Sequence, residues 1–439
     1  MKNANVNNIY KLDGVVPLRN AIPLGLQHIL AMFVANITPI MIIASVLKLD
    51  DTLSIRLIQN AMIVAGIGTL IQLHPLWKIG SGLPIVMGIS FTFLNTVLFI
   101  GSNYNMGTVI GCVIVGGIIE GTLGLFAKYW IRIISPIVAA TVVAAIGFSL
   151  LAVGANSFAG GLGSPDFGSV NNWIIGAVTL VSCLAFQVFL KGYLKVIAVL
   201  FGLICGYVLA IILGEVDFSI IGTTGIVSLP AILPFKPEFN FNAILSMLVI
   251  YLVSATETIG DTSAVCESGL NRRVETKELS GSIASDGFIS AIAGLFGCSP
   301  ITSFSQNVGL VAMTKVVNRF TIGTGAIILI IAGIFPIFGE ILRTIPQAVL
   351  GGCTIIMFGR IVLAGFQMIG KCGYSDRNIS IAALSLSIGL GFTQCVGMFK
   401  IFPAIFQSIF AENCVAIVFV LAIFLDLVLP KEKNEQSNK

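Results

Sequence analysis

Long apolar runs follow one another along almost the whole chain, and short polar or charged stretches separate them. Because about 20 apolar residues span a bilayer as a helix, these runs predict fourteen transmembrane segments. In chain order the segments cover residues 20–46, 54–74, 83–100, 106–126, 130–153, 173–190, 196–214, 242–265, 280–298, 300–315, 319–342, 346–368, 378–397 and 405–429. The third and tenth segments are short and rich in Gly, Pro and Ser, which makes them the weakest of the set.

Basic residues fall mainly on one side of these segments. If the N-terminus lies in the cytoplasm, the stretches on that side hold 18 of the 24 Lys and Arg residues, five lie on the other side, and Arg360 falls within a segment. Cytoplasmic loops are enriched in Lys and Arg. The distribution therefore predicts a multi-pass protein of the cell membrane with an even number of segments and both termini in the cytoplasm.

The composition is that of a polytopic, all-α membrane protein. Hydrophobic residues make up 56% of the 439 residues and charged residues only 10%, whereas soluble domains carry about 25% charged residues. The net charge of +4 gives no reason to expect nucleic-acid binding. The nine Cys residues include no C-x-x-C pair, so we interpret them as packing residues and not as metal ligands or disulfides. The polar N-terminus predicts no cleavable signal peptide.

The two weakest segments resemble each other. The stretch from Pro84 to Ser90 has the same spacing as the stretch from Pro300 to Gln306, and each continues from Pro-Ile through small and β-forming residues. The segments are seven apart, and because seven is odd, the second copy would enter the membrane from the opposite side. An inverted repeat with paired, interrupted segments points to a binding site near the membrane midplane. The alternative is two ordinary short helices whose similarity is due to chance.

Two carboxylates lie one helical turn apart inside the eighth segment. Glu257 and Asp261 follow an uncharged apolar run, and their i, i+4 spacing places them on one helix face. A carboxylate at bilayer depth costs about 2.5–3.5 kcal/mol on insertion scales, so it is expected to face the protein interior and to mark a substrate or ion path. A carboxylate also suits a ligand with adjacent N–H groups. The alternative is an internal ion pair, but the same and adjacent segments hold no Lys or Arg at similar depth.

Five further polar residues lie at predicted membrane depth. Asp286 could be a proton site coupled to the first carboxylate or a structural tie, and we interpret Glu120 as a structural residue within a helix pair. His28 could hydrogen-bond a carboxylate or take part in a proton relay, or it could be a packed core histidine. Gln306 and Asn307 offer amide donors and acceptors, which suit a planar ligand with C=O and N–H groups along one edge.

Several enzymatic motifs are absent from the sequence. It contains no Walker A motif, no G-x-G-x-x-G on a strand, no H-E-x-x-H and no G-x-S-x-G. These absences disfavour ATP hydrolysis by this chain and leave ion-coupled or passive transport.

The run from Gln306 to Lys315 resembles the signature of the nucleobase–ascorbate transporter family, also called nucleobase:cation symporter-2. The signature is usually written Q/E/P-N-x-G-x4-T-R/K/G, and the chain has Gln306-Asn307-x-Gly309-x4-Thr314-Lys315. Three further motifs agree with the family in order and place, namely Gln27-His28, Ser90-Phe91 and Glu257-Thr258-x-Gly260-Asp261. The resemblance covers nearly the whole chain.

This resemblance implies a fold of fourteen segments in two inverted repeats of seven, with short antiparallel β-strands in segments 3 and 10. Segments 1–4 and 8–11 would form a core domain, and segments 5–7 and 12–14 a gate domain. The implied boundaries are 1–19 for a cytoplasmic N-terminus, 20–126 and 242–344 for the core domain, 127–241 and 345–429 for the gate domain, and 430–439 for a cytoplasmic tail.

The resemblance also implies where a nucleobase would bind. Glu257 matches the carboxylate that hydrogen-bonds the base, and Gln306 matches a second side-chain anchor. The remaining substrate-binding residues implied by the resemblance are Ser90, Phe91, Phe304 and Ser305. The residues that match the binding network and the coupling and signature positions are Gln27, His28, Asp261, Asp286, Asn307, Gly309 and Thr314.

Substrate choice rests on two of these positions. Gln306 and Asp261 resemble the xanthine and urate branch, whereas uracil carriers commonly have Glu at the first position and can have His at the second. Lys315 departs from the commoner Arg of purine carriers. The expected function is import of a purine nucleobase by cation symport, with a proton or sodium as the coupling ion and alternating access as the mechanism. No cofactor or metal is expected, and the family resemblance suggests a homodimer.

Three alternatives remain open at this point. The first is a uracil-type pyrimidine permease. The second is an inorganic or organic anion transporter of a related 7+7 fold, which the fixed negative charge of Glu257 disfavours. The third is a membrane-embedded enzyme, for which no nucleophile–base pair stands out in the sequence.

Overall fold

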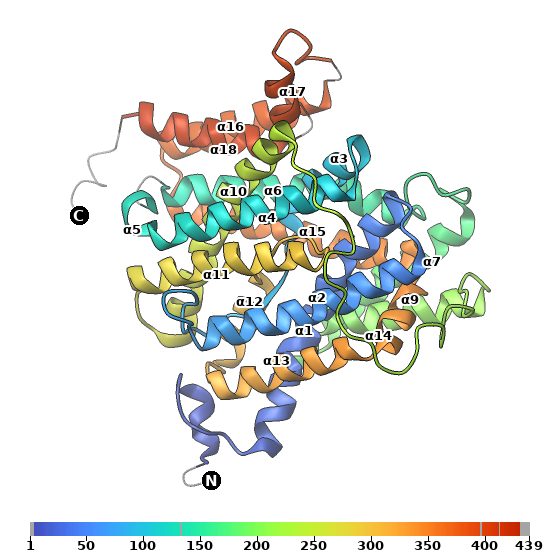
Figure 1. Cartoon of the computed structure of the whole chain (residues 1–439). Coiled ribbons are helices and arrows are strands. Elements are labelled where there is room, and N and C mark those ends of the chain that lie inside the picture. Colours follow the sequence, from blue (N-terminus) through green and yellow to red (C-terminus); the bar gives the residue numbers. More distant parts are fainter. Residues whose placement is uncertain (1–3, 132–133, 396, 412, 431–439) are drawn as a thin grey trace.

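The computed structural model describes residues 4–131, 134–395, 397–411 and 413–430. Residues 1–3 of the expected N-terminal segment and residues 431–439 of the expected tail lie outside the described part. Most of the long helices run side by side across the view of Figure 1. The bounds of the helices before the long connection at 213–240 are α1 Leu18–Val46, α2 Asp51–Leu73, α3 Leu94–Asn103, α4 Met106–Leu125, α5 Ala127–Trp130, α6 Pro136–Phe158, α7 Val170–Phe189, α8 Tyr193–Val196 and α9 Ala198–Ile212.

The second half of the chain repeats this succession of long and short helices. Their bounds are α10 Phe241–Leu270, α11 Thr276–Leu295, α12 Ser305–Thr314, α13 Arg319–Ile334, α14 Pro336–Arg343, α15 Gln347–Cys372, α16 Asp376–Gln394, α17 Ala404–Phe410 and α18 Cys414–Val428. Among the described residues, seven helices are long and apolar enough to cross a membrane, or eight if α13 and α14 form one span. The predicted class, a helical polytopic membrane protein, is confirmed. The number of fourteen segments stays a prediction.

Segments 3 and 10 contain the short strands that the sequence resemblance implies. Strand β1, Met87–Ile89, pairs antiparallel with β2, Ile301–Ser303, in the register Met87↔Ser303, Gly88↔Thr302 and Ile89↔Ile301. All six strand residues are buried. Because Pro lacks a backbone N–H and restricts the preceding residue, the Pro-containing stretches before both strands disfavour a continuous helix. Pairing the two stretches satisfies backbone groups that a lipid environment would leave without partners.

Three predicted segments differ from the structure. The eleventh segment was expected to run continuously over 319–342, but it bends by 79° at the break before Pro336. The fourteenth, 405–429, consists of α17 and α18. The fifth was expected to begin at residue 130, yet α6 begins at Pro136. Proline at a first helical position has no N–H that needs an intrahelical partner, which explains why helices start at Pro136 and Pro336.

The helices pack as two sets. The first helix set contains α1, α2, α4, α10, α11 and α13, with α3, α12 and α14 packed against it, and the second contains α6, α7, α9, α15, α16 and α18. Within the first set α4 and α11 approach very closely, because a Cβ placed on Gly287 would lie 2.0 Å from the backbone nitrogen of Gly121. Small residues at such contacts are typical of helix packing in membranes.

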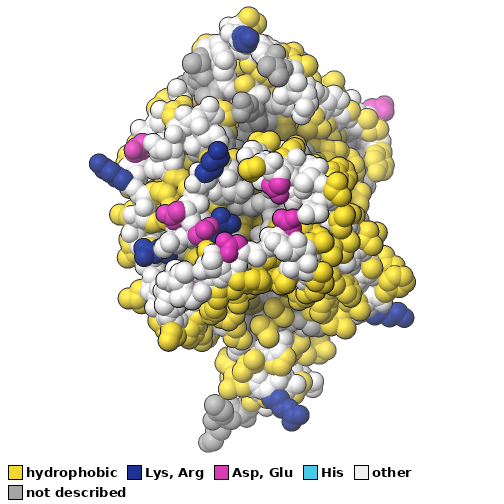
Figure 2. Space-filling model, turned by 90° about the vertical axis from the view of Figure 1, so that its right-hand side faces the viewer, with side chains coloured by type: hydrophobic (Ala, Val, Ile, Leu, Met, Phe, Trp, Pro, Cys, Tyr) yellow, Lys and Arg dark blue, Asp and Glu magenta, His cyan; other side chains and the backbone are white. Residues whose placement is uncertain are grey.

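The longest of the three connections between the two sets, residues 213–240, lies against the first set. Glu340 of α14 accepts hydrogen bonds from the backbone of Gly222 and of Thr224. Further bonds join the connection to α2, α11 and α4, namely Ser228 Oγ to Gln59 Oε1, Ala231 N to Asn60 Oδ1, Leu233 N to the Leu295 carbonyl and Glu238 N to the Gly107 carbonyl. Figure 2 shows the end of the molecule at the right of Figure 1, where charged side chains gather near the centre and hydrophobic side chains fill the flank.

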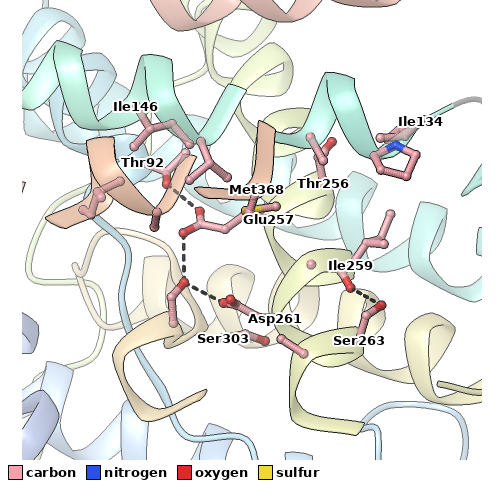
Figure 3. Close-up of a pocket in the computed structure, with 18 of the residues that line it drawn as sticks. Thr92, Ile134, Ile146, Thr256, Glu257, Ile259, Asp261, Ser263, Ser303 and Met368 are labelled. Atoms are coloured by element: carbon pink, nitrogen blue, oxygen red, sulfur yellow. Dashed lines mark hydrogen bonds between the residues drawn. The ribbon is translucent and has the colours of Figure 1, made fainter. Parts of the chain in front are cut away.

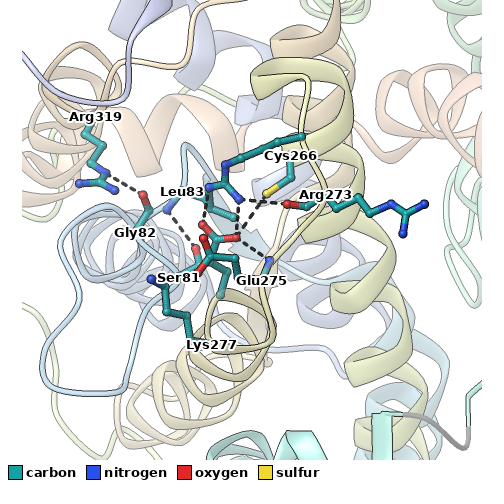
Figure 4. A network of polar contacts seen from close by, with 10 residues as sticks. Ser81, Gly82, Leu83, Cys266, Arg273, Glu275, Lys277 and Arg319 are labelled. Carbon is teal, nitrogen blue, oxygen red and sulfur yellow. Dashed lines mark hydrogen bonds and ion pairs between the residues drawn. The ribbon is translucent and has the colours of Figure 1, made fainter. Parts of the chain in front are cut away.

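At another surface Arg319, the first residue of α13, ties the N-terminal segment to the start of the third predicted span. Its Nε donates to the Gly82 carbonyl at 2.6 Å, as Figure 4 shows, and its Nη1 lies 2.9 Å from Asp13 Oδ1. Nearby, Arg272 pairs with Glu278 at 2.5 Å and closes the turn between α10 and α11. The Arg319 contacts hold the start of the third segment against α13, and the Arg272–Glu278 pair joins α10 to α11.

Candidate functional site

A cavity of about 670 Å³ lies where the two strands end, between the two helix sets. Its wall comes from the stretch 89–92, the stretch 303–306, and helices α6, α10 and α15. It extends to the end of the molecule at which α6 begins and α10 and α15 end, since Pro136, Glu267 and Lys371 also line it. We call this the cavity end and the opposite one the far end. The volume is typical of pockets for small organic ligands.

Glu257 is the central acid of this cavity. Its Oε2 accepts a hydrogen bond of 2.7 Å from Thr92 Oγ1, and Ser305 Oγ lies 3.2 Å from its Oε1 (Figure 3). The same Ser305 hydroxyl lies 2.7 Å from Asp261 Oδ2. The expected placement of both acids on one face of α10 therefore brings them to the same hydroxyl. Glu257 is only half-buried, so its carboxylate retains acceptor capacity that faces the cavity.

The Ser305 hydroxyl cannot satisfy both acids when both are ionised. A hydroxyl has a single hydrogen, so it donates to one carboxylate at a time and leaves its lone pairs facing the other. If either acid carries a proton, that acid can donate to the Ser305 oxygen while the hydroxyl donates to its neighbour. The arrangement of Glu257, Ser305 and Asp261 therefore suits a single shared proton or a cationic or N–H-bearing ligand.

Asp286 stands behind the cavity wall and is fully buried. Its carboxylate accepts from Thr258 Oγ1 at 2.6 Å, from Ser303 N at 3.0 Å and from Gln72 Nε2 at 3.3 Å. Ser303 Oγ also lies 3.0 Å from Oδ2. These bonds connect α11 to α10, β2 and α2, so Asp286 holds the strand that precedes Ser305. It does not line the cavity.

His28 and Asn307 contact each other inside the first helix set. The Asn307 amide donates to the His28 carbonyl at 3.0 Å and lies 3.4 Å from its ring Nδ1. Both side chains are buried, and so is Gln27. None of the three lines the cavity, so the imidazole faces an amide here, and among the contacts of the described residues it reaches no carboxylate.

The other residues expected at the site divide into two groups. Ser90, Phe91, Phe304 and Gln306 line the cavity together with the acids. Gly309 and Thr314 lie further along α12 and do not line it, and the Thr314 hydroxyl donates to the Leu310 carbonyl at 2.8 Å. Side chains at the N-terminus of α12 thus meet the cavity, while its later turns do not.

Sequence reasoning missed Thr92, which lines the cavity, and Phe358, which packs against a residue that lines it. Thr92 donates directly to Glu257, and its position just after Ser90-Phe91 could have marked it as part of the same interrupted stretch. Phe358 of α15 packs edge-to-face on Phe91, with ring centroids 5.1 Å apart. No local sequence signal identifies Phe358, since it lies in an ordinary apolar helix.

A second cavity of about 290 Å³ lies at the far end, between α1, α3, α6 and α15. Side-chain hydrogen bonds join the two helix sets here, and Asn95 and Gln347, the donors of two of them, line this second cavity. The bonds run from Asn95 Nδ2 to the Ser149 carbonyl at 3.0 Å, from Gln347 Nε2 to the Met41 carbonyl at 3.1 Å, and from Asn413 Nδ2 to Thr96 Oγ1 at 3.1 Å. We call these three bonds the far-end bonds. Together with the Phe91–Phe358 contact they separate the central cavity from the far end.

The described residues contain no group of three or more His, Cys, Asp or Glu side chains placed to hold a metal ion. The polar groups of the cavity are carboxylates, hydroxyls, the amide side chains of Gln306 and Asn378, the Lys371 ammonium group and the first backbone N–H groups of α12, which have no intrahelical acceptor. Such a set can bind the edge of a polar, planar ligand.

Comparison with known proteins gives consistent results. Residues 19–397 match the family model Xan_ur_permease, described as the Permease family. The chain is 32% identical to the xanthine permease XanQ of Escherichia coli K12, covering 98% of this chain and 95% of that protein. It is 35% identical to the uric acid permease PucK of Bacillus subtilis over 88% of each chain.

Among solved structures, the transmembrane domain of the bicarbonate transporter BicA from a cyanobacterium is similar in fold. The TM-score is 0.57 at 14% sequence identity, and the match covers 94% of this chain and 98% of that one. At this identity the likeness concerns the fold alone.

Proposed function

Because this chain belongs to the nucleobase–ascorbate transporter family of membrane permeases, we propose that it imports a purine nucleobase, xanthine or urate foremost, by cation symport. The matched relatives are permeases, so the protein is a multi-pass membrane transporter and not an enzyme. The resemblance of Gln306 and Asp261 to the purine branch favours a purine over uracil.

One observation carries the proposal: Glu257 and Gln306 line the same cavity, although 49 positions separate them in the chain. A carboxylate accepts two N–H groups side by side, and an amide both donates and accepts. A xanthine or urate edge presents N–H and C=O groups in alternation, so the two side chains match it. The backbone N–H groups at the start of α12 supply further donors, and the dipole of that helix favours a carbonyl oxygen there.

Two features of the fold support alternating access. The central cavity lies between the two helix sets, and in this proposal the first set acts as the core domain and the second as the gate domain. It extends to the cavity end, which the Lys and Arg distribution predicts to be cytoplasmic, while the far-end bonds join the sets at the other end. In this proposal the described state faces the cytoplasm.

The paired acids support coupling to a cation. Glu257 and Asp261 share one hydroxyl, and no ion pair of the described residues involves either of them. A proton bound to the pair would remove a charge that is costly at low dielectric and would let all three groups hydrogen-bond. Proton binding and substrate binding would then favour the same state, which couples them.

Uptake of labelled xanthine into proteoliposomes tests the function. We expect accumulation that an uncoupler abolishes, with competition by purines and none by ascorbate or sulfate. If accumulation depends on sodium and is unaffected by the uncoupler, the coupling ion is sodium and not a proton. If uracil or sulfate competes and unlabelled xanthine does not, the substrate is a pyrimidine or an inorganic anion and not a purine.

Two substitutions test the site. Glu257→Gln and Gln306→Ala should each reduce uptake sharply while the protein still reaches the membrane. Matched controls are Glu238→Gln, on the loop before α10, and Gln394→Ala, at the exposed end of α16. Wild-type kinetics in both site variants would reject the assigned pocket.

A further inference from the structure

Glu120 of α4 is a buried acid that the proposed substrate site does not use. Its side chain is 1% exposed, and neither carboxyl oxygen has a hydrogen-bond partner among the described residues. It does not line the central cavity. Every ion pair of the described residues lies elsewhere in the fold. Glu120 therefore differs from Asp286, whose carboxylate is fully hydrogen-bonded.

A second unpartnered group faces Glu120 from the neighbouring helix. The Ser254 hydroxyl of α10 is fully buried and is directed at the Glu120 carboxyl, but the two do not form a regular hydrogen bond. The other titratable groups around Glu120 are Asp286 of α11 and Tyr251 of α10. The Tyr251 hydroxyl donates to the Val113 carbonyl at 2.9 Å, so its hydrogen is engaged. Helix α3, which also packs on α4, has no titratable residue.

An ionised carboxylate in this position would face no cation, and the Ser254 hydroxyl is the one neighbouring group among the described residues that could stabilise it. Burying an unpaired charge costs several kcal/mol even after the protein relaxes. A bound cation would remove the cost, but a metal ion needs several oxygen ligands. The three surrounding helices, α4, α10 and α11, are uninterrupted, so their carbonyl groups are engaged within the helices and do not form the broken-helix ligand sets seen at sodium sites. A proton needs only the carboxyl group itself.

We propose that Glu120 is a titrating proton-binding site, separate from the substrate cavity and linked to it through α10 and Asp286. Helix α10 presents Ser254 to Glu120, Thr258 to Asp286, and Glu257 to the cavity. When Glu120 loses its proton, its charge faces Asp286, which holds Ser303 and thereby the strand before Ser305. Deprotonation thus opposes the arrangement that shapes the site. This inference rests on the proposed nucleobase transport, because substrate binding is its readout.

The test is substrate affinity as a function of pH, measured by titration calorimetry of the purified protein with xanthine. In the wild type one linked proton lets affinity fall by up to about tenfold per pH unit in the alkaline range. Glu120→Gln imitates the protonated acid, so it should bind like the wild type at acidic pH and lose clearly less affinity at alkaline pH. Ionisation of xanthine is common to both proteins and cancels in the comparison. Superimposable pH profiles would overturn the proposal.

Two further variants keep the test decisive. Glu340→Gln is the matched control, because Glu340 is equally buried but accepts hydrogen bonds from Gly222 and Thr224, and its profile should follow the wild type. Ser254→Ala covers the case in which Glu120→Gln does not fold. It removes the hydroxyl that could stabilise the ionised carboxylate, so the alkaline loss of affinity should begin at higher pH, and an unchanged profile counts against the proposal. Absence of xanthine binding by the wild type at every pH would instead refute the proposed function.

Discussion

Replacing Asn95, Gln347 and Asn413 by alanine should open the far end of the molecule. Each side chain donates one hydrogen bond across the boundary between the helix sets, at 3.0, 3.1 and 3.1 Å. At the cavity end the sets are separated instead by the 670 Å³ cavity. Removing the far-end bonds therefore weakens the state that faces the cavity end and favours the opposite one.

The size of the effect follows from the number of bonds. A neutral hydrogen bond contributes about 0.5–1.5 kcal/mol net, so each substitution should change the ratio of the two states by about 2- to 12-fold. Because the three bonds share no donor or acceptor, we treat their free-energy contributions as additive. The triple variant should then shift the ratio by about 1.5–4.5 kcal/mol, or about 10- to 2,000-fold.

Cysteine labelling from the far end measures this shift. Ser157 lines the 290 Å³ cavity and is 4% exposed, so Ser157→Cys should react slowly with a membrane-impermeant maleimide when the far end is closed. Exposed Cys395 is replaced by Ser to remove background. Labelling should accelerate with each substitution and most in the triple variant. Asn103→Ala is the control, because among the described residues the Asn103 side chain donates only within α3, to the Phe99 carbonyl. An unchanged rate in the triple variant would refute the reasoning.

Two further predictions concern stability. Gly287→Ala should sharply lower the thermal stability and yield of the purified protein, because its Cβ would lie 2.0 Å from the backbone nitrogen of Gly121. Gly359→Ala is the control and should be neutral or stabilising, because a Cβ at Gly359 would have nothing within 4 Å. Equal stability of the two variants would contradict the packing argument. Arg377→Leu should destabilise the protein by about 3–5 kcal/mol, since it leaves Asp426 buried without its partner at 2.8 Å, and adding Asp426→Leu should restore much of the loss in thermal unfolding experiments. A single variant as stable as the wild type would show that this pair is dispensable.

The elements at the site could be predicted from sequence because they depend on local chemistry. The i, i+4 spacing of Glu257 and Asp261 fixes one helix face, and Pro84 and Pro300 mark the interrupted segments. Pro336 is the same kind of signal for the bend in the eleventh segment. Because the apolar run continues through it, the sequence pattern predicted one uninterrupted segment over 319–342.

What the sequence could not provide is the position of groups brought together by distant segments. Ser305 lies between two acids of α10 only because β2 pairs with β1 in one register and Asp286 holds Ser303. His28 was expected either to hydrogen-bond a carboxylate or to be packed in the core. That it contacts Asn307 depends on how α1 packs against α12. Burial and hydrogen bonding between helices decide these contacts, and neither has a periodic signature.

The attachment of residues 222–238 to α2, α4, α11 and α14 limits where the molecule can flex. This segment is one of three chain connections between the helix sets, and it is hydrogen-bonded to the first set for most of its length. A hinge in this segment would fall between Ile212 and Gly222, where Gly214 has a φ of +76° and the Glu215 side chain accepts a hydrogen bond from Asn171 of α7. A fluorophore attached near Leu229 would move together with the first helix set. It would serve as a reference point for measuring the displacement of the second helix set.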